Sequence, residues 1–275
     1  MAGTGKTGSR LKNWLAAQLD QIHRNSAKVL RGVAVEPLHD LRVAALRVSF
    51  ALKFFNKYLS GGNANRLRHE FAHARHVMAQ RRDWDIFSSR VKKDFQVINT
   101  SPSLKQKILA IIKVQEAKAH RDLGHMIRSS RYKRMLRDLK QIAPSGNKRK
   151  FKPQHLFKDL LKTVKHKQAA LKPSELHKIR ITFKHLRYAC ELLADFYDKK
   201  KIHKVIHDII KIQDLLGEHQ DAETAVRMLN HLKITGHRKE IAKFIGMERN
   251  STLEARNKFV KMLNCSIEAF DIFRG

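Results

Sequence analysis

The chain has 275 residues, of which 57 are Lys or Arg and 25 are Asp or Glu, so its formal net charge is +32 with histidine neutral. Hydrophobic residues make up 42% of the sequence, which is enough for a packed core and excludes disorder of the whole chain. A charge this high is tolerated best beside a polyanion, so nucleic acid, an anionic membrane or polyphosphate is the expected kind of partner.

The N-terminus, residues 1–9, is basic and has no apolar segment of a signal peptide, so we expect a flexible basic tail. No run of 18 apolar residues occurs, and we therefore expect no membrane insertion. The two cysteines, Cys190 and Cys265, lie among apolar residues at helical spacing. They are interpreted as reduced core thiols, which indicates a cytoplasmic location.

Nearly every later segment has the apolar spacing of an amphipathic helix, and none shows convincing strand alternation. The sequence therefore predicts an all-α fold, interrupted where Gly, Pro, Asn or Ser cluster. In chain order, the expected helices span residues 9–31, 38–55, 64–79, 83–98, 103–128, 131–142, 154–171, 174–195, 200–216, 221–232 and 237–273.

Two of these helices carry the same apolar stripe, with spacings of 3, 4, 3, 4 and 3 residues from Leu38 to Phe55 and from Leu176 to Leu193. The stripes are offset by 138 residues, and the same offset relates His39 to His177 without a gap in the alignment. We interpret this as an internal duplication that gives two pseudo-symmetric antiparallel helical bundles. The expected limits are 10–143 for the first bundle, 144–153 for a basic linker and 154–275 for the second bundle.

A basic stripe accompanies the second apolar stripe: His177, Arg180, Lys184 and Arg187 are spaced 3, 4 and 3 residues apart and share one helix face. Arg offers a planar fork, Lys a mobile point charge and His a pH-dependent donor, a mixture that suits phosphate oxygens. A solvated surface explains most of the other basic residues. The first repeat has a weaker stripe, to which spacing adds Lys53, Arg75 and Arg82.

These segments resemble the CHAD family, the conserved histidine α-helical domain. The residues that carry the resemblance are His177-Lys178-Ile179-Arg180-Ile181-Thr182-Phe183-Lys184-His185-Leu186-Arg187 and, more loosely, His39-Asp40-Leu41-Arg42-Val43-Ala44-Ala45-Leu46-Arg47. A second segment, Leu216-Gly217-Glu218-His219-Gln220-Asp221, is also similar to a family motif.

The resemblance implies two helical bundles around a central basic groove that binds inorganic polyphosphate, with association to polyphosphate granules. It implies binding without catalysis, so no catalytic residue, metal or other cofactor is assigned. The groove residues that the resemblance implies are His39, Arg42, Arg47, His177, Arg180, Lys184 and Arg187. The sequence does not predict the oligomeric state.

Three alternatives stay open. Nucleic-acid binding is supported by the charge and by the basic run Lys148-Arg149-Lys150, although no recognised nucleic-acid-binding motif is present. The segment His69-Glu70-Phe71-Ala72-His73 matches a zinc metalloprotease pattern, but flanking arginines and a missing third ligand argue against metal. A scaffold for an acidic protein is the third alternative. The acidic residues Asp83, Asp85, Asp221 and Glu223 could form paired carboxylates or a metal site, but we expect them to begin helices, cap them and form ion pairs.

Overall fold

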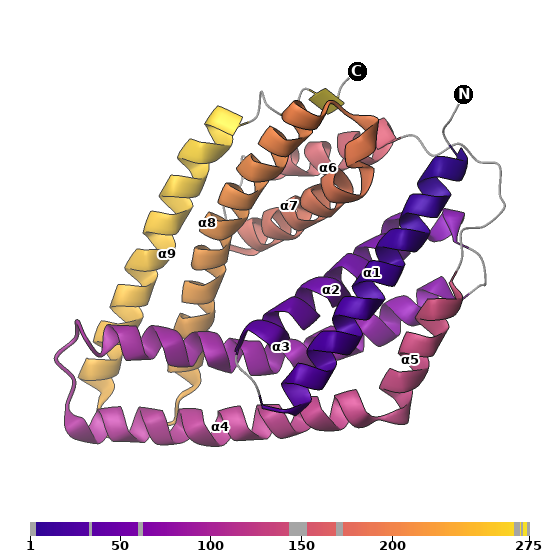
Figure 1. Cartoon of the computed structure of the whole chain (residues 1–275). Helices are drawn as coiled ribbons and strands as arrows, with labels where there is room; N and C mark the ends of the chain where they lie inside the picture. The colour runs from indigo at the N-terminus through magenta and orange to yellow at the C-terminus, as the bar shows by residue number, and fades with distance from the viewer. Residues whose placement is uncertain are drawn as a thin grey trace. The chain divides into compact units, whose positions relative to one another are not determined.

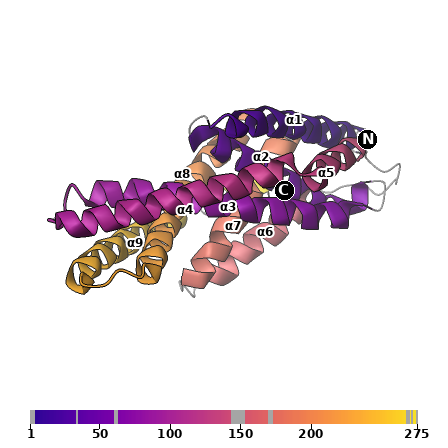
Figure 2. The same ribbon diagram turned by 90° about the horizontal axis from the view of Figure 1, so that it is seen from below.

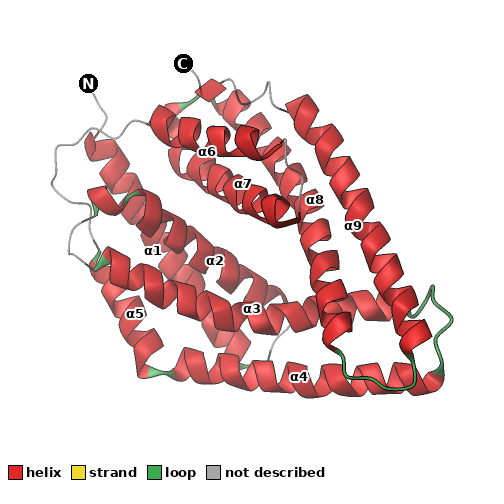
Figure 3. Cartoon of the chain, turned by 180° about the vertical axis from the view of Figure 1, so that it is seen from behind, coloured by secondary structure: helices red, strands yellow, loops and turns green. Residues whose placement is uncertain are grey.

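The structure, a computed structural model, is built from α-helices (Figures 1 and 3). It describes residues 4–32, 35–59, 63–142, 153–168, 173–266, 270 and 272–273. Within these ranges no β-strand occurs, which confirms the all-α prediction. The α-helices are α1 (Thr4–Leu30), α2 (Val35–Phe54), α3 (Ala64–Asp94), α4 (Pro102–Arg128), α5 (Ser130–Gln141), α6 (Pro153–Gln168), α7 (Pro173–Leu193), α8 (Lys199–His231) and α9 (Arg238–Ser266).

The chain divides into two compact units. The first comprises Met1–Ser88 and Ile108–Phe151, and the second comprises Ser89–Lys107 and Lys152–Gly275. The sequence analysis placed residues 89–107 in the first bundle, whereas their contacts assign them to the second unit. The reason is packing: Phe95 of this segment meets Phe244 of α9 edge to face, with ring centroids 5.6 Å apart.

The first apolar stripe forms the centre of the first unit. Leu38, Leu41, Ala45, Val48, Leu52 and Phe55 are all at most 4% exposed, as the 3, 4, 3, 4, 3 spacing predicts. Phe50 of α2 adds an aromatic cluster with Trp14, Phe54 and Phe55. The pairing of α1 with α2 gives this unit a helical hairpin, seen in Figure 1.

The second unit is organised around the equivalent stripe on α7. Leu176, Ile179, Phe183, Leu186, Cys190 and Leu193 are at most 1% exposed. Helix α7 packs against α6 and α8, and α8 packs along α9; Figure 2 shows α6 and α7 side by side. Cys190 is a buried free thiol whose pKa is raised by burial, which confirms its interpretation as a core residue. The side chain of Cys265 lies outside the described residues.

Element boundaries recur at the shift that the sequence predicts. Helix α2 begins at Val35 and α7 at Pro173, and each is followed by a short 3₁₀-helix, at Asn56–Tyr58 and Ala194–Phe196. The residues that precede these 3₁₀-helices, Phe55 and Leu193, share φ of −109° and ψ of 12°. The local structure of the two segments therefore repeats along with their apolar pattern.

Several predicted helix limits were wrong. The breaks expected after Ala79 and Leu216 do not occur, because α3 continues to Asp94 and α8 to His231. Gly217 lies in the gap expected between the helices at 200–216 and 221–232, but an interior glycine costs a helix only about 1 kcal/mol. Burial of Leu216 and Ala222, at 1% and 0% exposure, offsets that cost.

The segment predicted to be a flexible basic tail, residues 1–9, contributes to α1 from Thr4 onward. The expected linker, 144–153, lies almost entirely outside the described residues; only Pro153 is described, as the first residue of α6. In the described part of the chain, every helix is too short or too polar to cross a bilayer.

Candidate functional site

The basic stripe of the second repeat lies on one helix, α7. Its core-facing residues hold the helix in place, and the basic residues follow one position after Leu176, Ile179, Phe183 and Leu186. His177 is exposed, whereas Arg180, Lys184 and Arg187 are half-buried. These three cations therefore lie at the border of the core, where water screens their charges less than at an open surface.

Helix α8 runs antiparallel to α7 and supplies polar partners to this stripe. His177 Nδ1 lies 2.7 Å from Gln220 Oε1. Because an amide oxygen only accepts hydrogen bonds, Nδ1 donates, and the neutral ring then carries no proton on Nε2. Nε2 becomes a donor for an anion only when the ring is protonated.

Arg180 is a strongly desolvated cation of the stripe. Its Nε is buried and makes no hydrogen bond to any described residue. Burial lowers the pKa of the Arg180 guanidinium, and the negative charge of Asp221 opposes that change. A Cβ added at Gly217 would stand 3.9 Å from Arg180 Nη2, so α8 passes close to the guanidinium at its glycine. The guanidinium remains charged and has hydrogen-bonding capacity to spare.

Arg187, two turns further along α7, is held in place by two neighbours. Its Nε donates to Glu191 Oε1 at 2.8 Å, and its Nη1 donates to Gln213 Oε1 at 3.4 Å. Gln213 in turn donates from Nε2 to the carbonyl of Phe183 at 2.8 Å. Glu191 is therefore a carboxylate four residues from a stripe cation, and it partly offsets the charge of Arg187.

The first unit places its counterpart residues on α2 and α3. Arg82 of α3 lies close enough to His39 of α2 to lower the pKa of that histidine. Burial is the largest cause of this shift, Arg82 is the next, and the nearby Arg42 acts in the same direction. The cations Arg42 and Arg82 thus both lie near His39 in the first unit.

The remaining predicted residues of the first unit are more dispersed. Arg47 is half-buried on α2, and Arg75 on α3 turns its Nε to the carbonyl of Phe71 at 3.3 Å. Lys53 is exposed near the end of α2, with its Nζ 5.0 Å from the centre of the Phe54 ring. The structure thus brings His39, Arg42 and Arg82 together, while the central groove expected between the bundles stays a prediction.

Two polar residues of the α7–α8 pair were missed by the sequence analysis. Gln213 braces Arg187, and Gln220 binds His177. The signal was present, because a shift of 138 residues carries Arg75 and Arg82 onto these two glutamines. Glutamine carries no charge, so a pattern of charged residues does not include it.

The acidic residues expected to begin helices lie inside them instead. Asp83 and Asp85 are within α3, and Asp221 and Glu223 are within α8. Their surroundings are ionic: Arg81 Nη1 lies 2.5 Å from Asp85 Oδ1, and Asp221 opposes the buried charge of Arg180. The prediction of ion pairing therefore holds for Asp85, whereas the prediction of helix capping was wrong.

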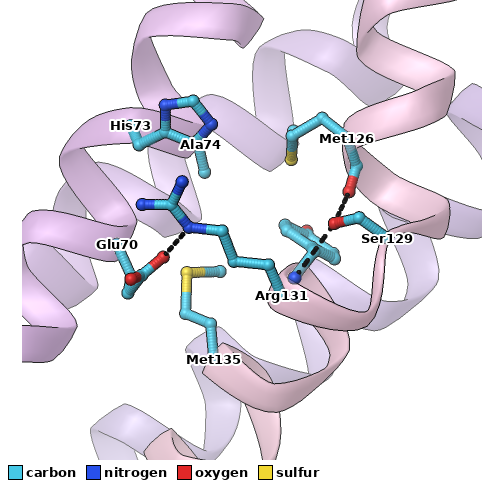
Figure 4. Close-up of a pocket in the computed structure, with 8 residues that line it drawn as sticks. Glu70, His73, Ala74, Met126, Ser129, Arg131 and Met135 are labelled. Atoms are coloured by element: carbon cyan, nitrogen blue, oxygen red, sulfur yellow. Dashed lines mark hydrogen bonds and ion pairs between the residues drawn. The ribbon is translucent and has the colours of Figure 1, made fainter.

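The segment that matches the metalloprotease pattern lies on α3 without the geometry of a metal site. Glu70 turns its carboxylate to Arg131 of α5, whose Nε lies 2.5 Å from Glu70 Oε2, and His73 lies beside this pair (Figure 4). Among the described residues, no group of three or more His, Cys, Asp or Glu side chains is placed to hold a metal ion. Glu70 is thus engaged as an ion-pair partner.

The α7–α8 arrangement gathers donors that suit an anion on one helix face. Arg180 and Arg187 present guanidinium groups, Lys184 an ammonium and His177 an imidazole along nearly three turns of helix, at about 3.6 residues per turn. Successive charges on one face suit a linear chain of anionic groups better than a single small anion.

Comparisons with known proteins agree with this architecture. The family model described as CHAD domain matches residues 13–230. PptA from Streptomyces chartreusis superimposes with a TM-score of 0.75 at 17% identity, covering 96% of this chain and 100% of that one. The crystal structure of the CHAD domain from the plant Ricinus communis gives a TM-score of 0.72 at 22% identity, covering 94% of this chain and 91% of that one. No curated protein sequence matches the chain significantly.

Proposed function

The chain belongs to the CHAD domain family, and on that premise we propose that it binds inorganic polyphosphate along the basic face of α7. The observation that carries the proposal is the state of Arg180. A half-buried guanidinium with a buried, unbonded Nε is costly unless an anion completes its surroundings. Lys184 and Arg187 extend the same face in the direction in which a linear polyanion would continue.

The two histidines give the proposed site a dependence on pH. His177 already donates from Nδ1 to Gln220, so it can donate to a phosphate oxygen only through a protonated Nε2. In the first unit, cationic neighbours disfavour the protonated form of His39. A bound polyanion would reverse that influence, so binding is expected to take up protons near neutral pH.

We propose that the first unit contributes through His39, Arg42 and Arg82, with Arg47, Lys53 and Arg75 as weaker contacts. Each phosphate that a cation neutralises releases condensed counterions, as happens when proteins bind nucleic acids. The affinity should therefore fall steeply with salt. A polyphosphate chain long enough to contact both units should bind more tightly than a short one, because the second contact is then intramolecular.

The proposal is tested by removing charge from the stripe while keeping the side chains polar. Arg180→Gln with Arg187→Gln should weaken binding of long-chain polyphosphate at least tenfold and reduce its salt dependence, measured by titration calorimetry at several salt concentrations. The matched control, Lys204→Gln with Lys211→Gln, removes the same charge from two exposed positions on α8, outside the stripe on α7.

A comparison of the two double variants, a check of folding and a substitute variant decide how the result is interpreted. Equal losses in both double variants would mean that net charge alone drives binding and would contradict a localised site. Circular dichroism and thermal unfolding of each variant show whether its helices are intact. Should the Arg180 variant unfold, Lys184→Gln with Arg187→Gln tests the same face without touching the buried guanidinium.

A competition experiment separates polyphosphate from nucleic acid. Long-chain polyphosphate should resist displacement by duplex DNA or single-stranded RNA at equal phosphate concentration and near-physiological salt. Displacement by nucleic acid under these conditions would replace the present proposal with nucleic-acid binding, for which the net charge alone provides the attraction.

We propose further that the chain binds polyphosphate without cleaving it, and that in cells it associates with polyphosphate granules. Incubation with polyphosphate should leave chain length unchanged and release no orthophosphate, with and without added Mg²⁺, Mn²⁺ or Zn²⁺. A fluorescent fusion should co-localise with granules and lose that localisation in the Arg180 and Arg187 double variant. Metal-dependent phosphate release would contradict the non-catalytic part of the proposal.

A further inference from the structure

A second site lies in the first unit, away from the helix faces already described. A cavity of about 430 Å³, open to solvent, is lined by residues of α1, α4 and α5. Its size falls within the range of small-molecule pockets. The floor is apolar and made by Leu19, Ile127, Leu136 and the ring of Tyr132, none of which is more than 8% exposed.

The rim of this cavity is cationic. Lys133, Arg137 and Lys140 follow each other at spacings of 4 and 3 residues, so they share one face of α5. His23 of α1 also lines the cavity, and all four of these side chains are exposed. None of the described residues that line it is acidic. The cavity therefore combines an apolar floor with an uncompensated positive rim.

A hydroxyl pair marks the polar end of the floor. Ser26 Oγ and Tyr132 Oη lie 2.9 Å apart and are buried, and burial raises the pKa of Tyr132 to about 12. One O–H of the pair is used in their mutual hydrogen bond, which leaves one for a ligand. A single free donor is too little for the edge of a nucleobase, which has several polar groups to satisfy. An aliphatic ligand makes no such demand.

Tyr132 also lines a second cavity, and the two cavities differ in the balance of charge among their lining residues. The second cavity is smaller, about 200 Å³, and is lined by Met126, Met135 and Tyr132. Its charges cancel internally, because Arg131 extends across it to pair with Glu70 (Figure 4). The larger cavity has basic residues at the corresponding place and lacks such an internal counter-charge among its lining residues.

We propose that the cavity between α1 and α5 binds a small amphipathic anion, an aliphatic chain that carries a phosphate group. The chain would cover Leu19, Ile127 and Leu136, while the phosphate would lie at the rim between Arg137 and Lys140. Both parts are needed: burial of the chain supplies the affinity, and the rim selects the charge. This site is independent of the polyphosphate site, since it shares no residue with it.

The test uses octyl phosphate below its micelle-forming concentration, titrated into the full chain. Octyl phosphate should bind with one-to-one stoichiometry and shift the methyl NMR signals of Ile127 and Leu136. Octyl glucoside, which lacks the charge, and inorganic phosphate, which lacks the chain, should each bind at least tenfold more weakly. Shortening the chain to hexyl phosphate should lower the affinity by up to about fourfold per methylene removed.

Variants locate the site. Arg137→Gln with Lys140→Gln should weaken octyl phosphate at least fivefold, whereas polyphosphate binding should change less than twofold. The control, Arg134→Gln with Lys113→Gln, removes equal charge from exposed positions of the same unit that do not line the cavity. All of these positions are exposed, so the variants should fold.

Three results would overturn the inference. The first is equal binding of octyl glucoside and octyl phosphate, and the second is an equal loss in the control variant. The third is full displacement of octyl phosphate by polyphosphate, which would make the cavity part of a general polyanion surface. Vesicles that contain phosphatidic acid distinguish the source of the ligand. If the chain binds them and that binding depends on Arg137 and Lys140, the ligand is a membrane lipid, and the proposal of a free small molecule is overturned.

Discussion

His177 Nδ1 lies 2.7 Å from Gln220 Oε1, and 138 residues earlier in the chain the corresponding residues are His39 and Arg82. In the second unit, the histidine therefore contacts the neutral acceptor Gln220. In the first unit, the corresponding histidine lies near the cation Arg82. The acceptor orients the ring of His177, whereas burial and then Arg82 lower the pKa of His39. Two positions related by the 138-residue offset thus have different electrostatic settings.

The first prediction concerns the titration of His39. Its pKa lies below 6.5 because burial, Arg82 and Arg42 outweigh the opposing carboxylates of Glu36 and Asp40. Arg82→Gln removes the largest of the charge contributions and should raise the NMR titration midpoint of His39. In the parent chain, the contribution of His39 to the free energy of unfolding is present above pH 6.5 and falls as the pH drops below it. An unchanged midpoint in the variant would show that Arg82 does not act on His39.

How much of this could be predicted from the sequence depends on the kind of signal. The apolar stripes from Leu38 to Phe55 and from Leu176 to Leu193 were predicted residue by residue, because 3.6-residue periodicity reports burial directly. Helix limits near Gly217 were not, because the packing of Leu216 and Ala222 outweighs the local preference of glycine. Propensity is a local property, whereas a helix ends where its buried contacts end.

The sequence predicted those residues of the candidate site that are cationic, or become so on protonation, and lie on a single helix. The positions of His177, Arg180, Lys184 and Arg187 on α7 follow from spacing alone. The partners on α8 required knowledge of which helices pair and in which register, and no single-helix pattern contains that information. Assignment of residues 89–107 to the second unit is a tertiary property of the same kind.

A second prediction concerns the carboxylate that holds Arg187. The Arg187–Glu191 pair is partly exposed, at 31% and 21% for the two side chains, so it should contribute little to stability. Glu191→Gln removes the competing anion and should raise polyphosphate affinity about two- to fivefold. The control is Glu254→Gln, an exposed acid on α9 of the same unit. An equal rise in both variants would show that only net charge matters.

A third prediction concerns Gly217, which lies inside α8. A Cβ there meets only Arg180 Nη2, at 3.9 Å, an ordinary van der Waals distance. Gly217→Ala should therefore raise the free energy of unfolding by roughly 0.5–1 kcal/mol, measured by urea denaturation. Gly246→Ala on α9, where no atom lies within 4 Å of an added Cβ, is the matched control and should give a similar gain. Destabilisation by Gly217→Ala alone would mean that α8 approaches α7 more closely than the structure shows.

The last prediction concerns two carboxyl groups buried together in the second unit. Asp94 and Glu248 are 4% and 1% exposed, and Arg90 donates from Nε to both oxygens of Glu248 at 2.8 Å. Burial, followed by the proximity of Glu248, raises the pKa of Asp94 to about 6. The positive charge of Arg90 thus acts on both carboxyl groups. A protonated Asp94 can also donate a hydrogen bond to Glu248.

The sign of the resulting pH dependence follows from proton uptake. Because the folded-state pKa of Asp94 lies above its ordinary value of 3.8, the folded chain holds a proton that the unfolded chain has lost between pH 4 and 6. The contribution of Asp94 to the free energy of unfolding is therefore complete below about pH 4 and lost as the pH rises through about 6. Asp94→Asn mimics the protonated acid, since its amide donates to Glu248 at every pH. It should raise the free energy of unfolding at pH 8 by about 1–3 kcal/mol and have little effect at pH 4.

Urea denaturation at pH 4, 6 and 8 checks this prediction, with Asp214→Asn as the control for an exposed acid on α8. Subtracting the parent curve from each variant isolates the substituted group, because every other titrating group is common to both. The control should differ from the parent by less than about 0.5 kcal/mol at each pH. A loss of stability at pH 8 in Asp94→Asn would contradict the assignment, because it would show that an ionised Asp94 is needed as a partner of Arg90.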